Sequence, residues 1–308
     1  MRYTSEIQTS IHTEQTGISS SSEKKHKKNI KKDKRKSRKK LILNSKNIKN
    51  MNIIGANTAG LLNKIQSLKS LISRFEPAVI LLQETKVRSK NKLKLDNYFV
   101  YEHIRTESGG GGLLTAVHKS LEPVEITNIE DGEEILTVEA IINNKKVRFI
   151  NDYGPQETAS EDNRKAFFNF LDLEVRKAKT ARSLVCIEMD SNAKLGSKLI
   201  PLDPKPQSAN GMLLAQVLEN NNLTVVNGLD CCDGLITRYR KTVNNVEESV
   251  LDHLIVCENM LPNIEKMIVD ESGAYSLTPN TLILKVTKRV SKIVIIGQLL
   301  LVLIFNGH

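Results

Sequence analysis

Short, uninterrupted apolar runs recur along this chain from residue 52 onward, each bounded by turn residues. The clearest run, Ala78–Gln83, has the length of a strand and shows no alternation of apolar and polar residues. Such a run is typical of a strand that is covered on both faces. The chain therefore has to place other layers over its strands, which restricts it to layered folds that contain sheets.

Other segments fit this picture. Leu61–Phe75 is predicted to be a helix because its apolar residues recur at helical spacing. Further helices are predicted at Glu161–Lys179 and Met212–Asn220. Further strands are predicted at Asn52–Ala56, Leu113–His118, Ile135–Ile142, Val147–Tyr153, Ser183–Met189, Leu223–Val226 and Leu251–Cys257. Few helices among many strands predict an α/β (α+β) fold, most simply a β-sandwich flanked by helices.

Residues 1–50 differ in composition from the rest. They are rich in Ser, Thr, Lys and Asn and almost free of aromatic residues, so they cannot bury enough apolar surface to fold, and we expect a disordered basic arm. Its twelve basic residues are Lys24, Lys25, Lys27, Lys28, Lys31, Lys32, Lys34, Arg35, Lys36, Arg38, Lys39 and Lys40. They are candidates for binding nucleic-acid phosphates. A nuclear-import signal and a merely solubilising tail are the alternatives.

The charge outside this arm is small. With Asp33, the stretch from Lys24 to Lys40 carries +11, and subtracting it from the formal charge of +10 leaves −1 for the other residues. The start of the chain has no apolar signal core, so we expect an intracellular, and specifically nuclear, protein. The apolar run Ile293–Phe305 is shorter than the roughly 20 residues of a membrane-spanning helix, so we do not expect a membrane anchor.

Polar residues stand at the ends of the predicted strands, where rigid strands can aim side chains into a common cleft. They are Asn57, Glu84, Tyr153, Asp190, Asn192 and Asp252. Carboxylate and carboxamide oxygens are ligands that suit Mg²⁺, and Glu84 fits such a role. Taken singly each residue is weak evidence, because Asn and Asp are also common turn formers.

The order of the short motifs around these residues is more specific. Five motifs resemble those of the endonuclease/exonuclease/phosphatase superfamily over residues 52–285. Their sequences are most similar to those of retrotransposon endonuclease domains of the apurinic/apyrimidinic-like type. The strongest is Pro77–Lys86 (PAVILLQETK), similar to P-D-I-L-x-L-Q-E-T-K. The others are Ala56–Lys64 (ANTAGLLNK), Asn151–Pro155 (NDYGP), Glu188–Ala193 (EMDSNA) and Ser249–Val256 (SVLDHLIV).

The resemblance implies a four-layer sandwich of two β-sheets flanked by helices, and hydrolysis of a phosphodiester by water. It implies that Glu84, with Asn57 beside it, holds Mg²⁺ or Mn²⁺ and that Asp190 orients or deprotonates the attacking water. Asn192 and Tyr153 would hydrogen-bond the phosphate, and Asp252 would orient a histidine that contacts the same phosphate. No small-molecule cofactor is implied.

One family motif is missing. The family closes with a Ser-Asp-His motif before its last strand, yet Tyr275–Thr281, which precedes the predicted strand Leu282–Val286, has neither Asp nor His. His253 is a poor substitute, because it follows Asp252 directly and neighbours on a strand point to opposite faces. Losing the histidine removes a donor from the transition state and predicts reduced activity.

Two functions remain open. The first is a metal-dependent DNA endonuclease derived from a non-LTR retrotransposon, formed by a domain at residues 51–288 and followed by an apolar tail at 289–308 that has no family counterpart. The second is a catalytically inactive relic that keeps the fold and binds nucleic acid. RNA is an alternative partner to DNA, and the same fold also serves phosphatases.

Overall fold

The structure is a computed structural model that describes residues 51–89, 93–105, 110–126, 134–241, 245–270 and 295–296. The basic arm, the stretch Tyr275–Thr281 and the predicted strand Leu282–Val286 lie outside the described residues. All of the described residues belong to one structural unit, Ser45–His308.

The first sheet is built from one continuous stretch of chain. Its four strands, in the spatial order β1-β2-β4-β3, are β1 (Ile53–Asn57), β2 (Val79–Gln83), β3 (Tyr98–His103) and β4 (Leu113–His118). β1 and β2 run parallel, and parallel neighbours need a crossover connection, which a helix supplies here. That helix is α2 (Ile65–Phe75), which buries Leu68, Leu71 and Phe75. The predicted helix from Leu61 is in fact two pieces, because a 3₁₀ turn, η1 (Leu62–Lys64), precedes α2.

The second sheet has six strands in the order β5-β6-β7-β8-β13-β9. They are β5 (Val124–Glu125), β6 (Ile135–Ile142), β7 (Lys145–Tyr153), β8 (Leu184–Asp190), β13 (Asp252–Cys257) and β9 (Leu223–Val225). β7 and β8 are parallel and are connected by α3 (Glu161–Thr180), while α4 (Ala209–Asn220) leads into β9. Ser160 and Ser208 cap these two helices by accepting backbone N–H groups at their first turns.

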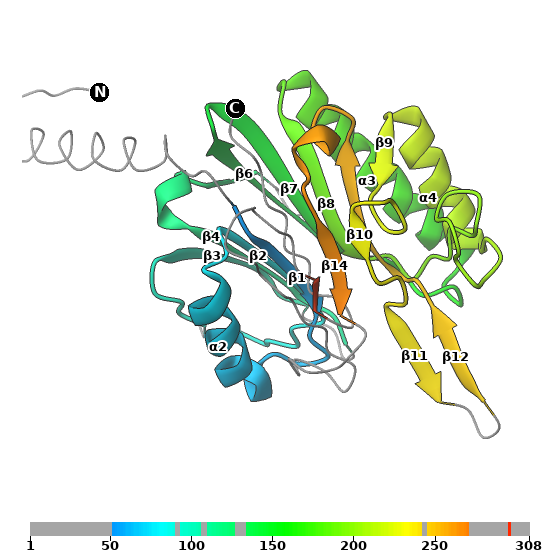
Figure 1. The fold of residues 1–308 in the computed structure, drawn as a ribbon, viewed down its shortest axis with the longest axis horizontal. Coiled ribbons are helices and arrows are strands. Elements are labelled where there is room, and N and C mark those ends of the chain that lie inside the picture. The colour runs from blue at the N-terminus through cyan, green and yellow to red at the C-terminus, as the bar shows by residue number, and fades with distance from the viewer. Residues whose placement is uncertain are drawn as a thin grey trace, which may run out of the picture. The chain divides into compact units, whose positions relative to one another are not determined.

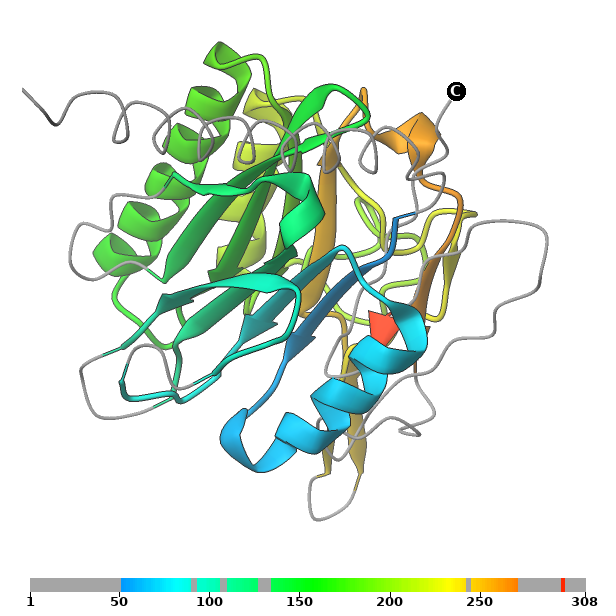
Figure 2. The same ribbon diagram turned by 90° about the vertical axis from the view of Figure 1, so that its left-hand side faces the viewer.

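The two sheets pack face to face and the helices cover their outer faces (Figures 1 and 2). One apolar cluster joins inward-facing residues of both sheets, such as Leu81 and Phe149. A second cluster joins the six-stranded sheet to α3 and α4, with Phe168 and Ile187 among its members. This arrangement confirms the predicted four-layer sandwich of two sheets flanked by helices.

The remaining elements are short. β11 (Arg238–Lys241) and β12 (Val246–Ser249) form an antiparallel hairpin that extends from the sandwich in Figure 1. β10 (Cys232–Asp233), β14 (Met267–Asp270) and β15 (Ile295–Ile296) form a small parallel sheet, and η2 (Lys119–Leu121) and η3 (Leu261–Asn263) are single turns. No helix within the described ranges is long and apolar enough to cross a membrane.

A buried polar link connects the two sheets between their apolar layers. Gln83, the last residue of β2, donates from its side-chain amide to Asn151 Oδ1 at 2.7 Å and to Glu188, both on the second sheet. Asn151 donates in turn to the backbone oxygens of Leu82 and Leu114 at 3.2 and 3.0 Å. These bonds fix how the carboxyl ends of β2 and β7 face each other.

Candidate functional site

The topology brings strand ends from both sheets to one place. Asn57 ends β1 and Glu84 directly follows β2, and the parallel pairing of these strands puts both residues at one edge. On the second sheet, Tyr153 and Asp190 are register partners at the ends of the parallel strands β7 and β8. Asp252 begins the antiparallel β13 and is also a register partner of Asp190. Five residues that are far apart in sequence thus meet.

Asn57 connects the two sheets within this site. Its side-chain Nδ2 donates to Glu84 Oε1 at 3.1 Å and to Asp190 Oδ2 at 2.7 Å. Tyr153 donates its hydroxyl to the same Oε1 of Glu84 at 2.9 Å. Lys86 Nζ lies 3.1 Å from the other oxygen, Oε2. Glu84 is therefore the residue on which the hydrogen bonds of the site converge.

The two carboxylates differ in their affinity for a proton. Burial raises the pKa of Glu84, but hydrogen bonds from Asn57, Lys86 and Tyr153 outweigh it, so its pKa lies below the ordinary value. Burial raises the pKa of Asp190 to about 6, although the hydrogen bond from Asn57 opposes the shift. A carboxylate that stays ionised suits a metal ligand, and one with a pKa near neutrality suits a general base.

Asn192 is held in place through its own backbone. It adopts the left-handed region with φ 47°, where its N–H donates to Asp190 Oδ1 at 3.2 Å. Its side-chain amide donates to the Gly154 carbonyl at 2.9 Å. Glu84 also has a left-handed backbone, with φ 45°. Non-glycine residues adopt this region at a cost, and such costs concentrate at functional sites.

Asp252 lacks the partner that the family motif would supply. The side chain is buried, and among the described residues its Oδ1 accepts no hydrogen bond. Burial, followed by repulsion from Asp190, raises its pKa well above the ordinary value. Its neighbour His253 does not fill the gap, because that ring is buried and lies 2.9 Å from the Ser191 hydroxyl. Burial lowers the pKa of His253 to about 3, so the ring is neutral.

The residues present fit a hard divalent cation. Buried carboxylates crowd here, and Asp252 retains an unpartnered oxygen, so added positive charge would relieve their repulsion. Within the described ranges, however, no three His, Cys, Asp or Glu side chains are grouped closely enough to hold a metal ion. Mg²⁺ usually takes only one or two carboxylates with water and substrate phosphate, so Glu84 can supply the protein carboxylate. Asn57 faces Glu84 and Asp190 through its amide nitrogen, while its Oδ1 accepts the Ala59 N–H at 3.0 Å, so the amide would have to turn to offer its oxygen to a cation.

Two polar side chains around the site are not among the residues predicted from the sequence. Lys86 contacts Glu84, and Gln156 donates to the Tyr153 hydroxyl at 3.4 Å. Lys86 belongs to the Gln-Glu-Thr-Lys motif, and its spacing of two from Glu84 could have indicated it. The twelve basic residues of the arm lie outside the described residues, so their role in binding nucleic acid stays a prediction.

Residues 49–187 match the model of the Endonuclease/Exonuclease/phosphatase family. The stretch contains Asn57, Glu84 and Tyr153 but ends before Asp190. No curated protein is significantly similar in sequence to this chain. Beyond residue 187, two short motifs and the likeness to solved structures connect the chain to known proteins.

Solved structures resemble the chain over most of its length. The endonuclease domain of TRAS1, a telomere-specific non-LTR retrotransposon, is 17% identical with a TM-score of 0.58, covering 84% of this chain and 99% of that one. The AP endonuclease LMAP of Leishmania major is 12% identical with a TM-score of 0.63, covering 84% and 89%. The 3' phosphatase NExo of Neisseria, bound to a product DNA hairpin, is 15% identical with a TM-score of 0.60, covering 83% and 100%. At these identities the likeness shows the fold alone.

Proposed function

We propose that this chain, which has the fold of the endonuclease/exonuclease/phosphatase family, hydrolyses phosphodiester bonds of DNA with the help of a divalent metal ion. The observation that carries the proposal is the hydrogen-bonded group formed by Glu84, Asn57 and Asp190 across the two sheets. Proteins with this fold include a retrotransposon endonuclease, an AP endonuclease and a DNA-bound phosphatase.

Each residue has a role that follows from its contacts. Glu84 and Asn57 would hold Mg²⁺ or Mn²⁺, which would stabilise charge on the phosphate and on the departing oxygen. Asp190 accepts a proton from the attacking water as the water oxygen bonds to phosphorus and the bond to the departing oxygen breaks. Tyr153 and Asn192 would donate hydrogen bonds to the phosphate oxygens in exchange for their present acceptors, the Glu84 carboxylate and the Gly154 carbonyl.

We expect reduced activity in comparison with relatives that keep the Asp-His pair. The unpartnered Oδ1 of Asp252 supports this view, because the oxygen that would orient a histidine has no partner among the described residues. Losing one donor to the transition state costs on the order of a hundredfold. An origin from a non-LTR retrotransposon, DNA rather than RNA as substrate, and a nuclear location are further parts of the proposal.

The test is a plasmid-nicking assay with Mg²⁺. Wild type should convert supercoiled DNA to nicked circles, and Glu84→Ala and Asp190→Ala should each lower the rate by at least about a hundredfold. Glu219→Ala, which removes an exposed carboxylate at the end of α4, is the matched control and should nick like wild type.

An inactive, nucleic-acid-binding relic is the second candidate, favoured by the missing Asp-His pair. It predicts that wild type, Glu84→Ala and Asp190→Ala all leave the plasmid intact while still retarding it in a gel. That result would remove hydrolysis from the proposal and leave binding.

A further inference from the structure

A cluster of basic side chains surrounds a small pocket between the hairpin β11–β12 and the loop that precedes α4. Its charged lining residues are Lys194, Lys205, Arg238, Arg240 and Glu247, four cations and one carboxylate with a net charge of +3. The cavity has a volume of about 80 Å³. Pockets for small organic molecules start at roughly 300 Å³, so this one suits a single small anionic group.

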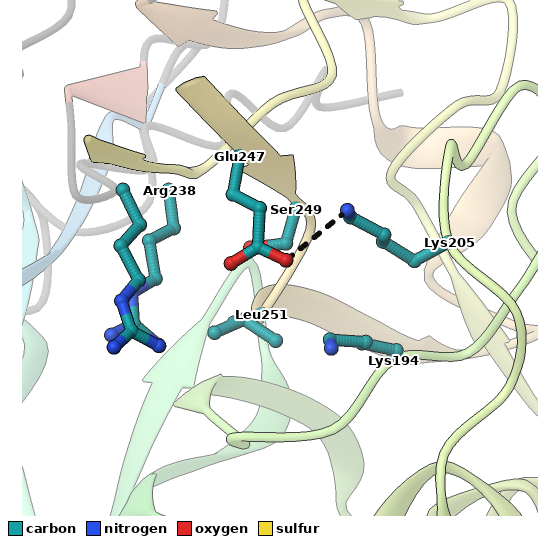
Figure 3. Close-up of a pocket in the computed structure, with 7 residues that line it drawn as sticks. Lys194, Lys205, Arg238, Glu247, Ser249 and Leu251 are labelled. Atoms are coloured by element: carbon teal, nitrogen blue, oxygen red, sulfur yellow. Dashed lines mark ion pairs between the residues drawn. The ribbon is translucent and has the colours of Figure 1, made fainter. Parts of the chain in front are cut away.

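One face of the hairpin lines the pocket. Arg238 is the register partner of Ser249, and Arg240 is the register partner of Glu247, so these four side chains share one face. In Figure 3, Glu247 and Ser249 lie between Arg238 on one side and the two lysines on the other.

The opposite wall is a loop whose backbone is fixed. Lys194 and Ser208 hold its base, with Lys194 N donating to Ser208 Oγ and Ser208 N donating to the Lys194 carbonyl, each at 3.0 Å. Asp203 accepts the N–H groups of Gly196 and Lys205 within the loop. Lys194 and Lys205 therefore start from a set backbone position, which lowers the entropic cost of binding an anion.

Most of this positive charge is not neutralised by the protein. Glu247 pairs with Lys205 at 3.5 Å. In the part of the chain that the structure describes, no carboxylate lies within ion-pair distance of Lys194, Arg238 or Arg240. Arg238 nevertheless attracts the Asp190 and Asp252 carboxylates at longer range, so Lys194 and Arg240 are the pocket cations without a carboxylate partner among the described residues. Like charges that gather without a counter-ion repel each other, and a bound anion would remove that repulsion.

The pocket is connected to the candidate site on both sides. Lys194 comes two residues after Asn192 on one wall. On the other, Thr237 Oγ1 accepts the backbone N–H groups of Leu251 at 2.9 Å and Asp252 at 3.1 Å, which fixes the start of β11 against the start of β13. A polynucleotide whose reacting phosphate lies at Asp190 thus has a second cationic position close by.

We propose that this pocket binds a backbone phosphate of the nucleic acid, one that neighbours the phosphate at the hydrolytic site. The inference rests on the proposed function for its choice of ligand. It adds a cationic phosphate contact inside the folded domain, whereas the basic residues predicted from the sequence to bind phosphates all lie in the arm. Phosphate contacts orient a strand without reading its bases, so the pocket fixes the position of the strand and not the sequence that is cut.

The test compares the full-length double variant Lys194→Gln/Arg240→Gln with Lys69→Gln/Lys198→Gln, which removes the same charge from exposed positions that do not line the pocket. Binding of a fluorescent DNA duplex is measured by anisotropy without divalent metal over a range of salt. The pocket variant should bind roughly tenfold more weakly, and its log–log salt slope should fall by about 0.9 for each phosphate that the protein no longer neutralises. The control should match wild type. Thermal melting verifies that both variants are folded.

Two further experiments distinguish the alternatives. Both double variants should hydrolyse a dinucleotide, whose single phosphodiester leaves no second phosphate for the pocket, at the wild-type rate. A slower reaction of the pocket variant with that substrate would show an effect on the hydrolytic site itself and overturn the proposal. Inorganic phosphate that binds wild type and not the pocket variant, with DNA binding unchanged, would identify a free-phosphate site instead. If wild type hydrolyses no substrate, the proposed function fails, while the anisotropy result still decides the pocket.

Discussion

At the scale of single residues, the site depends on carboxylates that are buried to different degrees and partnered differently. Glu84 has three hydrogen-bonding partners and a lowered pKa, whereas Asp190 is more deeply buried and has a raised one. Such a pair separates the task of holding a cation from the task of taking a proton. The separation has a cost in stability, because ionised Asp190 is poorly compensated when no metal is bound.

Asp190→Asn should therefore stabilise the metal-free protein while abolishing hydrolysis. The Asp190 pKa is about 6 in the folded state against 3.8 in the unfolded chain, so ionisation destabilises the fold increasingly as pH rises through this interval. Chemical denaturation with a chelator at pH 8 should show a gain of up to about 3 kcal/mol, and the gain should vanish near pH 4.

The exposed Asp96→Asn is the control for this experiment and should show no comparable gain. An Asp190→Asn variant no more stable than wild type at pH 8 would contradict a raised pKa for this carboxyl. A bound cation would lower this pKa, so in the active protein the rate should rise with pH and level off below about 6.

The residues of the site were predictable for a simple reason. Each stands at the end of a strand that apolar patterning alone identifies, and the short motifs indicate which of the polar residues at strand ends belong to the site. The partners were not predictable in the same way. Asn57 bonds Asp190 across the two sheets, and nothing in either local sequence specifies a contact over that separation.

At the scale of elements, the apolar runs predicted the central strands well. The bounds of β4 and β6 agree with the predicted Leu113–His118 and Ile135–Ile142. The hairpin β11–β12 was missed, because its strands are largely charged and exposed and lack the alternation of a half-buried strand. Because the hairpin forms one wall of the basic pocket, the pocket was not predicted either.

The two sheets approach each other closely at Gly55 in the middle of β1. A Cβ placed there would lie 2.3 Å from Glu188 Cδ and 2.5 Å from its Cγ. Gly55→Ala should therefore push the sheets apart and lower the free energy of unfolding by about 1–3 kcal/mol. Urea denaturation measures the change, and Gly110→Ala, whose Cβ would make only ordinary contacts, is the control.

A double-mutant cycle tests the cause. In a Glu188→Ala background the obstructing side chain is gone, so Gly55→Ala should cost much less. An equal cost in both backgrounds would mean that the glycine is needed for a reason other than its closeness to Glu188.

At the scale of the whole molecule, positive charge has two proposed locations, the basic arm and the basic pocket. The arm has the larger charge, +11 between Lys24 and Lys40. Phosphate contacts by flexible lysines act through counter-ion release and carry little sequence preference. The arm should therefore set how tightly the protein holds any DNA, and the pocket how the strand lies at the site.

Deleting residues 1–50 should weaken DNA binding and flatten its salt dependence, with the slope reduced by about 0.9 for each phosphate of duplex DNA that the arm neutralises. Replacing the twelve Lys and Arg residues by Gln keeps the length of the arm and should have the same effect. Anisotropy titrations over a range of salt measure it. An unchanged slope in both variants would leave the arm without a role in binding.

The site is divided between two sheets, and each sheet comes from its own stretch of the chain. Asn57 and Glu84 lie on the first stretch, whereas Tyr153, Asp190 and Asp252 lie on the second. Both sheets belong to one structural unit with a shared apolar cluster, and such a unit folds as a whole. A cation-binding half without its proton acceptor cannot cut anything. The proposed hydrolysis therefore cannot begin until β13 has left the ribosome and the two sheets have packed together.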